Sequence, residues 1–469
     1  MLDISRRQLI KTAGVTTILS MIPTPLIANS RIPLKIPPLI DLHRGKPAYL
    51  NIDVAQAILS ENTPVEVWGI NGNYLGPTFK IRQDDFAKIT YKNNLNQNVS
   101  INIQGLQTSG ELIGGMTRVL KTNETWSPII QINQPASTCW YHSCSLGNSA
   151  YQTYRGIAGM YIIEDKESRH SQLPQKYGIN DIPLILQDLQ LNTNGVQLFQ
   201  QNRPHFYGNR LFVNGKENPY IVVEKELIRL RLVNASLSRV YDLHFDDDRE
   251  FKIIAQDQGF LPQAKIATQI TLSPSERVEI LVDMSNSEKA TLITGKKQNF
   301  FNRITQVFQS SDNFIDNTVL EIQTKGLASA FNNKKHFQFN TDSATIYEHK
   351  GIKERSLHID TKTGLINGKL FNPRRVDITA KLGSTEKWTI TSSSPIGFKI
   401  QGAKFIIETI NDQPLPDNEK CWKDSLWIDQ KITILIKFEN RSSNNYPFTF
   451  GSSDLMLADK GCLGVLVVQ

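Results

Sequence analysis

Short strand-like runs separated by turn residues make up the chain from about residue 31 onward, and no long segment has the 3.6-residue period of a helix. Within residues 81–91, Ile81, Phe86, Ile89 and Tyr91 form one strand-like region. Residues 227–233 alternate apolar and basic side chains, as a half-buried strand does. Turn dipeptides interrupt the runs at Gly76-Pro77, Asn214-Gly215, Ser273-Pro274 and Asn367-Gly368. This pattern predicts an all-β protein built from β-sandwiches.

The length and the turns together suggest three domains. A chain of 469 residues has room for about three domains of ~150 residues each. We predict a first domain over residues 31–165, a second over 182–324 and a third over 356–469. The polar stretch 325–355 is expected to be a linker or an exposed crossover. A weak internal repeat agrees with this division, because each block has an Asn-Gly turn ahead of strands, at Asn71-Gly72, Asn214-Gly215 and Asn367-Gly368.

The first thirty residues have the pattern of a twin-arginine export signal. Ser5, Arg6 and Arg7 begin it, a moderately apolar run covers residues 12–22, and Ala28 and Ser30 flank a small-x-small cleavage site. The apolar run is too short and too rich in Thr to span a bilayer. We therefore expect export by the twin-arginine translocase, a mature chain beginning near residue 31, location in the periplasm and no stable membrane anchor.

Charge and cysteine content bear on two points, the class of partner and the presence of disulfides. The net charge is +7, and the basic residues are scattered rather than gathered in one stripe, so no nucleic-acid partner is expected. Four cysteines, an even number, permit two disulfides in an oxidising compartment. Folding in the cytoplasm before export favours unpaired thiols instead. The cysteines are Cys139, Cys144, Cys421 and Cys462.

Several common catalytic patterns are missing from the sequence. The glycines of residues 110–115 are not followed by the Lys-Ser/Thr pair of a phosphate-binding loop. No Gly-x-Ser-x-Gly motif marks a nucleophilic serine. Asp246, Asp247 and Asp248 could suggest calcium, but they fall between two strand-like runs, which favours a solvated hairpin turn.

Four segments resemble the copper-binding motifs of multicopper oxidases. Residues 446–464 resemble the closing motif of that family, residues 140–144 resemble Trp-Tyr-His-Ser-His, and residues 99–106 and 394–402 match its two other histidine motifs. The resemblance places Ile396, Ser452, Leu457 and Cys462 at the ligands of the mononuclear copper; we call these the mononuclear positions. It places eight further residues, here called the trinuclear positions, at the ligands of the three-copper cluster: Asn102, Gln104, His142, Cys144, Lys399, Gln401, Gly451 and Ser453.

This resemblance implies three cupredoxin-like Greek-key β-sandwich domains in the multicopper-oxidase arrangement, without the copper. Only His142 keeps the residue type of a family ligand. A blue copper site needs a thiolate and two imidazoles, whereas Ile396 and Leu457 have no lone pair to give. The ammonium of Lys399 would repel a metal dication. His142, Cys144 and Gln104 could hold a soft metal loosely, but we expect His142 and Cys144 to be ordinary core residues. No cofactor or metal site is therefore predicted.

A more specific resemblance is to the copper-free members of this superfamily that act in bacterial cell division. It rests on the segments 37–47, 68–77, 257–262, 421–427 and 456–461, which agree in order along the chain. It implies a non-enzymatic periplasmic protein that stabilises or protects the divisome at the septum under stress, with divisome proteins of the septal ring as partners. Exposed tryptophans are candidate anchors for such contacts, although a core role is the expected one for each: Trp126, Trp422 and Trp427.

Two other interpretations remain open at this point. The chain could be a degenerate multicopper oxidase with residual metal-dependent activity on phenols. It could also carry a small ligand where the copper cluster would lie, unless side chains such as Phe398, Lys399 and Gln401 fill that place.

Overall fold

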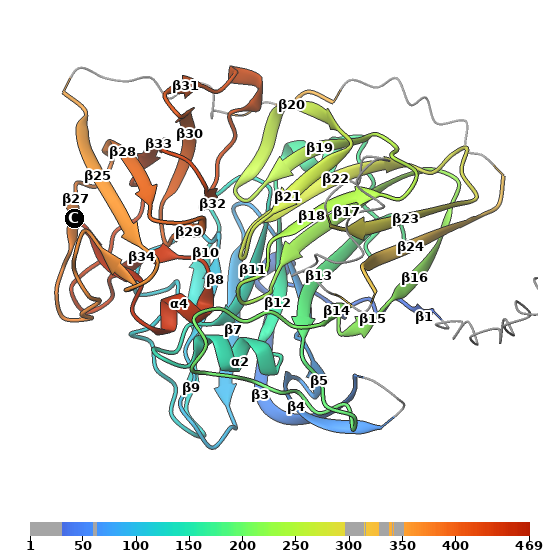
Figure 1. Cartoon of the computed structure of the whole chain (residues 1–469), viewed down its shortest axis with the longest axis horizontal. Coiled ribbons are helices and arrows are strands. Elements are labelled where there is room, and N and C mark those ends of the chain that lie inside the picture. The colour runs from blue at the N-terminus through green and yellow to red at the C-terminus, as the bar shows by residue number, and fades with distance from the viewer. Residues whose placement is uncertain are drawn as a thin grey trace, which may run out of the picture. The chain divides into compact units, whose positions relative to one another are not determined.

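The computed structural model describes residues 31–59, 63–295, 314, 316–327, 337–339, 341 and 351–469. Within Ile32–Gln469, which forms one compact unit, the strands make six sheets that face each other in pairs (Figure 1). Each pair encloses its own hydrophobic core. The expectation of three cupredoxin-like β-sandwiches is confirmed. The residues of the export signal, Ser5, Arg6, Arg7, Ala28 and Ser30, and most of the predicted linker lie outside the described residues.

The first sandwich pairs a sheet of order β10-β7-β3-β4-β5, with β9 on β7, and a sheet of order β2-β6-β12-β11-β8. Two short helices and a 3-10 turn complete it. Its elements are β2 (Leu39–Asp41), η1 (His43–Gly45), β3 (Pro47–Ile58), β4 (Pro64–Ile70), β5 (Asn73–Tyr74), β6 (Thr78–Arg82), β7 (Phe86–Asn93), β8 (Ile101–Gln104), β9 (Thr125–Trp126), β10 (Ile129–Gln131), β11 (Ser137–Ser143), α2 (Ser149–Arg155), β12 (Ala158–Glu164) and α3 (Lys166–His170). The single strand expected over residues 81–91 is two strands, β6 and β7, joined by a turn.

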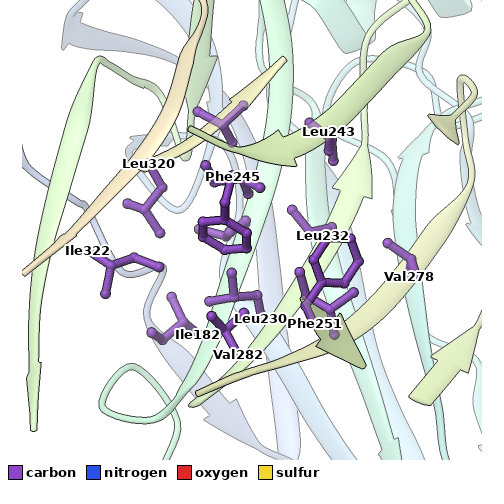
Figure 2. Close-up of a cluster of buried hydrophobic side chains, with 14 of the residues drawn as sticks. Ile182, Leu230, Leu232, Leu243, Phe245, Phe251, Val278, Val282, Leu320 and Ile322 are labelled. Carbon is purple, nitrogen blue, oxygen red and sulfur yellow. The ribbon is translucent and has the colours of Figure 1, made fainter. Parts of the chain in front are cut away.

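The second sandwich pairs sheets of order β1-β16-β24-β23-β18-β21 and β15-β14-β13-β17-β22-β19-β20. Its core packs side chains such as Leu232, Phe245 and Phe251 between the sheets (Figure 2). Its elements are β1 (Ile32–Pro33), β13 (Asp181–Leu189), β14 (Arg210–Val213), β15 (Lys216–Glu217), β16 (Pro219–Glu224), β17 (Leu227–Asn234), β18 (Tyr241–Phe245), β19 (Phe251–Gln256), β20 (Gly259–Ala267), β21 (Gln269–Leu272), β22 (Arg277–Asp283), β23 (Lys289–Thr294) and β24 (Thr318–Lys325). Strand β1 pairs in parallel with β16, so the start of the described chain belongs to this sandwich.

The third sandwich pairs sheets of order β26-β25-β28-β33-β30-β31 and β27-β35-β34-β29-β32. Its elements are β25 (Lys353–Asp360), β26 (Leu365–Ile366), β27 (Ile378–Ala380), β28 (Thr385–Ser392), β29 (Ile396–Ile400), β30 (Lys404–Ile410), β31 (Gln413–Pro414), η4 (Asp417–Glu419), β32 (Ser425–Ile428), β33 (Ile432–Lys437), β34 (Phe448–Ser452), α4 (Leu455–Asp459) and β35 (Leu463–Val468). No helix in the described part of the chain is long and apolar enough to cross a membrane.

The same asparagine clamp occurs once in each sandwich. Each clamp begins at the asparagine of a two-residue Asn-Gly turn in which both residues have positive φ. These turns are Asn71-Gly72, Asn214-Gly215 and Asn367-Gly368. Each asparagine side chain also bonds a neighbouring strand twice. Its Oδ1 accepts from one backbone N–H, and its Nδ2 donates to the carbonyl two residues earlier, at distances of 2.7–3.0 Å. Asparagine suits this place because it tolerates positive φ and carries both a donor and an acceptor.

Strand β17 departs from the half-buried strand predicted for residues 227–233, because all its residues are buried. The basic side chains do not reach solvent. Arg229 and Arg231 both pair with Glu279 on the adjacent strand β22, and Arg231 also pairs with Asp181 on β13. Burial opposes ionisation of Glu279, but the two guanidinium groups prevail and lower its pKa to about 2. Alternation of apolar and basic residues here reflects buried ion pairs rather than a wet face.

Apolar contacts join the three sandwiches to one another. One buried cluster contains Val67 and Trp140 of the first sandwich, Phe212 of the second, and Leu455 and Met456 of the third. Each Å² of apolar surface that such contacts remove from water contributes about 25 cal/mol to stability. One hydrophobic cluster therefore holds the three sandwiches together in addition to the chain that links them.

Candidate functional site

The trinuclear positions lie on four strands from two sandwiches. Asn102 and Gln104 are on β8, His142 is on β11 and Cys144 follows it directly. On the third sandwich, Lys399 is on β29 and Gly451 is on β34, with Gln401 and Ser453 one residue beyond these strands. The strands pair within each sandwich, His142 opposite Asn102 and Lys399 opposite Gly451. The positions read from the motifs thus fall on adjacent strands.

The mononuclear positions are filled by apolar packing. Ile396, Leu457 and Cys462 are at most 3% exposed and belong to the core of the third sandwich. The Ser452 hydroxyl, at the thiolate position, donates to the carbonyl of Asp454 at 3.1 Å. Burial raises the pKa of the Cys462 thiol to about 12, so it stays protonated. All four side chains are buried, and three of them belong to the hydrophobic core of the third sandwich.

The trinuclear positions are instead polar and meet across the two sandwiches. Gln401 Nε2 donates to Asn102 Oδ1 at 2.7 Å, which ties the third sandwich to the first. His142 is 1% exposed, stacks on Trp140 with ring centroids 4.2 Å apart, and has its Nδ1 2.6 Å from the carbonyl of Ser143. A carbonyl oxygen only accepts, so Nδ1 carries the hydrogen. Because burial and the charge of Lys399 hold the pKa of His142 well below its usual value, the ring is neutral and Nε2 keeps a lone pair.

Lys399 and Cys144 are both half-buried, and the charge of each influences the pKa of the other. Burial lowers the pKa of Lys399 to about 8, although Cys144, Asp424 and Asp459 pull it the other way. Burial raises the pKa of Cys144 to about 11, against the attraction of Lys399. At neutral pH the pair is therefore mostly an ammonium and a thiol, and not the thiolate that binds soft metals.

These residues do not fit the coppers of the family. Leu457 and Ile396 have no donor atom, and Lys399 places a positive charge at one of the trinuclear positions. Among the described residues, no group of three or more His, Cys, Asp or Glu side chains could hold a metal ion. Of the three side chains considered from sequence for a loose metal site, Gln104 donates through Nε2 to Asp424 at 3.0 Å, and the Cys144 thiol stays protonated because burial raises its pKa to about 11.

A buried ionic junction joins all three sandwiches next to Gln104. Arg277 of β22 donates to Asp424 of the third sandwich at 2.7 and 2.5 Å, and to the carbonyl of Thr138 in the first at 3.0 Å. Arg277 and Asp424 are each 1% exposed. Burial disfavours the guanidinium charge, but the carboxylates of Asp424 and Asp257 outweigh this and raise the pKa of Arg277. Gln258 also donates to Asp424 and, at 2.8 Å, to the carbonyl of Gly105.

Lys423 extends the junction on the third sandwich. Its ammonium lies 3.3 Å from Asp257 Oδ2 and 3.1 Å from Glu276 Oε1, both on the second sandwich. Burial opposes ionisation of Asp257, yet the charges of Lys423 and Arg277 lower its pKa below the usual value. Sequence reasoning did not find this junction. Its only signal was that the segments 257–262 and 421–427 were two of those that carried the resemblance to cell-division proteins; here they lie in contact.

The remaining candidates fall in different environments. Trp422 is buried and so cannot serve as an exposed anchor, whereas Trp126 and Trp427 are half-buried. Trp126 stacks on Tyr91 with centroids 5.3 Å apart. All four cysteines are free thiols. The turn with Asp246, Asp247 and Asp248 is exposed, but the prediction of a hairpin is wrong, because β18 and β19 belong to facing sheets.

Comparison with known proteins agrees with this geometry. The sequence profile of the multicopper oxidase family matches residues 51–168. The cell division protein FtsP of Aggregatibacter aphrophilus is 57% identical, with 100% of both chains covered. The cell division protein FtsP of Escherichia coli K12 is 36% identical over 100% of this chain and 99% of its own length.

Solved structures of oxidases share the fold. A laccase-like multicopper oxidase from Ochrobactrum superposes with a TM-score of 0.84 at 28% identity, covering 93% of this chain and 100% of its own. The McoA multicopper oxidase of Aquifex aeolicus has a TM-score of 0.82 at 23% identity, with 94% of this chain and 100% of its own covered. Full-length relatives at 36 to 57% identity, on a multicopper-oxidase fold with altered ligand positions, establish that this chain belongs to the cell division protein FtsP family.

Proposed function

We propose that this protein is a non-enzymatic component of the cell-division apparatus, exported to the periplasm, which stabilises or protects the divisome at the septum under stress through protein–protein contacts. The observation that carries this proposal is the match to division proteins along the whole chain. The side chains at the mononuclear positions support it, since a core of Ile396, Leu457 and Cys462 offers no redox centre. The ionic junction supports a rigid scaffold, because buried charge pairs fasten the second sandwich to the third and Arg277 also donates to a carbonyl of the first.

The place of action is tested with a fluorescent fusion exported by the chain's own signal. We expect the fusion to gather at midcell in dividing cells, more strongly under envelope stress. The variant with Arg6→Lys and Arg7→Lys is the matched control and should keep the fusion in the cytoplasm. Export without enrichment at the septum, in stressed and unstressed cells, would refute the septal role. Export of the double-lysine variant at the normal rate would refute the twin-arginine route alone.

A degenerate oxidase is the competing function, and metal analysis separates the two. Protein purified from copper-supplemented cells should contain far less than one copper per chain and should not oxidise a phenolic dye. Near-stoichiometric copper together with dye oxidation would overturn the proposal. The matched comparison is the His142→Ala variant, which should leave both readouts unchanged because His142 does not act as a ligand.

A further inference from the structure

Buried polar atoms without partners gather around the trinuclear positions. Gln104 Oε1, His142 Nε2 and Ser453 Oγ have no hydrogen-bond partner anywhere in the described chain, and the same holds for Trp140 Nε1 and Ser273 Oγ. These five residues are at most 3% exposed, and we call them, with Lys399, the polar cluster. Buried polar groups are nearly always hydrogen-bonded, to protein or to something else. Five such atoms at or beside the trinuclear positions therefore need a partner that the protein does not supply, either water or another small species.

The members of the polar cluster lie close together in the fold. Trp140 stacks on His142, and Gln104 is opposite Trp140 in the β8–β11 ladder. A Cβ placed on Gly397 would come within 2.0 Å of Ser453 Oγ and 3.8 Å of Ser273 Oγ. Gly397 and Lys399 share one face of β29, because alternate residues of a strand point the same way. The two halves meet where Gln401, two residues after Lys399, donates to Asn102, which lies opposite His142 in the β8–β11 ladder.

Donors outnumber acceptors in this cluster. The Nε2 of Gln104 donates to Asp424, so its Oε1 is an acceptor, and the neutral ring of His142 makes Nε2 a second acceptor. Against these two stand the Trp140 N–H, the three hydrogens of the Lys399 ammonium, and the hydroxyls of Ser273 and Ser453, which can also donate. A species that satisfies the cluster must accept more hydrogen bonds than it gives.

The charge of the cluster has the same consequence. Within the residues that the structure describes, the Lys399 ammonium has no carboxylate within 4 Å and no hydrogen bond. The nearby carboxylates are already engaged: Asp424 binds Arg277, and Asp459 accepts from Ser149 and Ala150 at 2.5–3.0 Å. An ammonium held without a counter-ion in a low-dielectric setting is destabilised, and an anion beside it offsets that cost. Lys399 and Cys144 each keep part of their surface exposed.

We propose that the polar cluster binds a small inorganic anion, held by the Lys399 ammonium with the Trp140 N–H and the serine hydroxyls, while water serves the acceptors of Gln104 and His142. The anion takes the place that metal cations occupy in the oxidases of the same fold. The expected ligand is an anion rather than a cation because Lys399 carries a positive charge at neutral pH. This site is independent of the proposed role in division, and either can fail without the other.

Titration calorimetry on the full mature chain tests the site, with sodium iodide and inorganic phosphate as separate probes. We expect one site per chain for at least one probe. Lys399→Met should weaken binding at least tenfold, Lys399→Arg should keep it within about threefold, and the exposed Lys381→Met serves as the matched control and should leave it unchanged. No binding to the wild type by either probe, or equal binding by Lys399→Met, would overturn the proposal.

The pH profile and a crystal soak give readouts that a purely structural lysine would not move. Affinity should fall about tenfold per pH unit above the Lys399 pKa of about 8, because only the ammonium binds. The other charged groups near Lys399 are Arg277, Asp424 and Asp459, with the thiol of Cys144. Anomalous scattering from iodide beside Lys399 is the expected result. Ordered water alone at the cluster would count decisively against an anion.

Discussion

The mononuclear and trinuclear positions differ from the copper ligands of the oxidases in opposite ways. At the mononuclear positions, Ile396, Leu457 and Cys462 have joined the apolar core of one sandwich. At the trinuclear positions, amides, a lysine and a histidine remain, and they bridge two sandwiches through the bond from Gln401 to Asn102. The first place lies within one hydrophobic core, where apolar side chains fill the gap. The second lies where two sandwiches meet, and there hydrogen bonds between polar side chains hold the sandwiches in a defined relative position.

Replacement of metal-ligand positions has different structural consequences inside a domain and between domains. Apolar packing is non-directional and tolerates any side chain of suitable volume. A junction between domains needs directional contacts to fix their orientation, and the ionic junction of Arg277, Asp257 and Asp424 supplies them. We therefore expect shortening of a buried side chain to lower stability in both regions. Removal of a charge should change stability only at the junction between the sandwiches.

The largest effect should come from Arg277→Met. The substitution leaves the buried Asp424 carboxylate without its cation and leaves Asp257 with Lys423 alone, and breaking a buried ion pair in this way costs about 3–5 kcal/mol. Denaturant unfolding at pH 7 measures the loss. The control is the double variant Arg277→Met with Asp424→Leu, which removes a charge from both sides and should recover part of the stability. A loss below about 1 kcal/mol for the single variant would show that the junction does not fasten the sandwiches.

At the mononuclear positions, Leu457→Ala should lower the free energy of unfolding by about 2–5 kcal/mol, because it opens a cavity in a closed core. Leu457 is 3% exposed and packs in the core of the third sandwich. Leu457→Met is the matched control of similar volume and should cost less than about 1.5 kcal/mol. If both substitutions had equally small effects, the position would be loosely packed, and the contrast with the trinuclear positions would disappear.

The asparagine clamps give a smaller effect that depends on burial. Asn214→Ala removes both bonds of a clamp that is 2% exposed and should cost about 1–3 kcal/mol, because the N–H of Ile185 and the carbonyl of Pro183 lose their partner. Asn71→Ala and Asn367→Ala break the same bonds at exposed sites, where water replaces them, and should cost about 0.5–1.5 kcal/mol. Thermal unfolding ranks the three, and equal losses would mean that burial is not the deciding factor.

The smallest effect, and the one with a distinctive pH dependence, should come from Lys399→Met. Removing a half-buried ammonium should raise stability on the order of 1 kcal/mol below pH 8 in low-salt buffer. The folded-state pKa of Lys399 is depressed to about 8 from 10.5, so the unfolded chain binds more protons between these values. The wild type should therefore gain stability relative to the variant as the pH rises from 8 to 10.5. A constant difference across that range would contradict the buried charge.

Local signals allowed much of the fold to be predicted from the sequence. The Asn-Gly dipeptides predicted turns at three places, and all three occur with positive φ, because the turn chemistry resides in the two residues themselves. The ligand motifs placed His142 and Lys399 on their strands because spacing along a strand is also local. Such features need no knowledge of distant partners.

Features that depend on distant partners were not predicted. Arg229 and Arg231 suggested a half-wet strand, since nothing near them in sequence shows that Glu279 and Asp181 lie alongside. The ionic junction was missed for the same reason, because Arg277 and Asp424 are separated by 147 residues. The turn after β18 was assigned to a hairpin because sequence order does not reveal that the next strand joins the facing sheet.

The short strand β1 has a practical consequence for any shortened version of the chain. Its residues Ile32 and Pro33 cover the outer edge of β16, whose other side is paired with β24. A chain beginning after Leu34 would leave that edge bare, including the half-exposed Tyr220 and Ile221. Uncovered strand edges invite pairing between molecules. We therefore expect the residues next to the expected cleavage site to limit self-association, and an N-terminal boundary should be drawn before them.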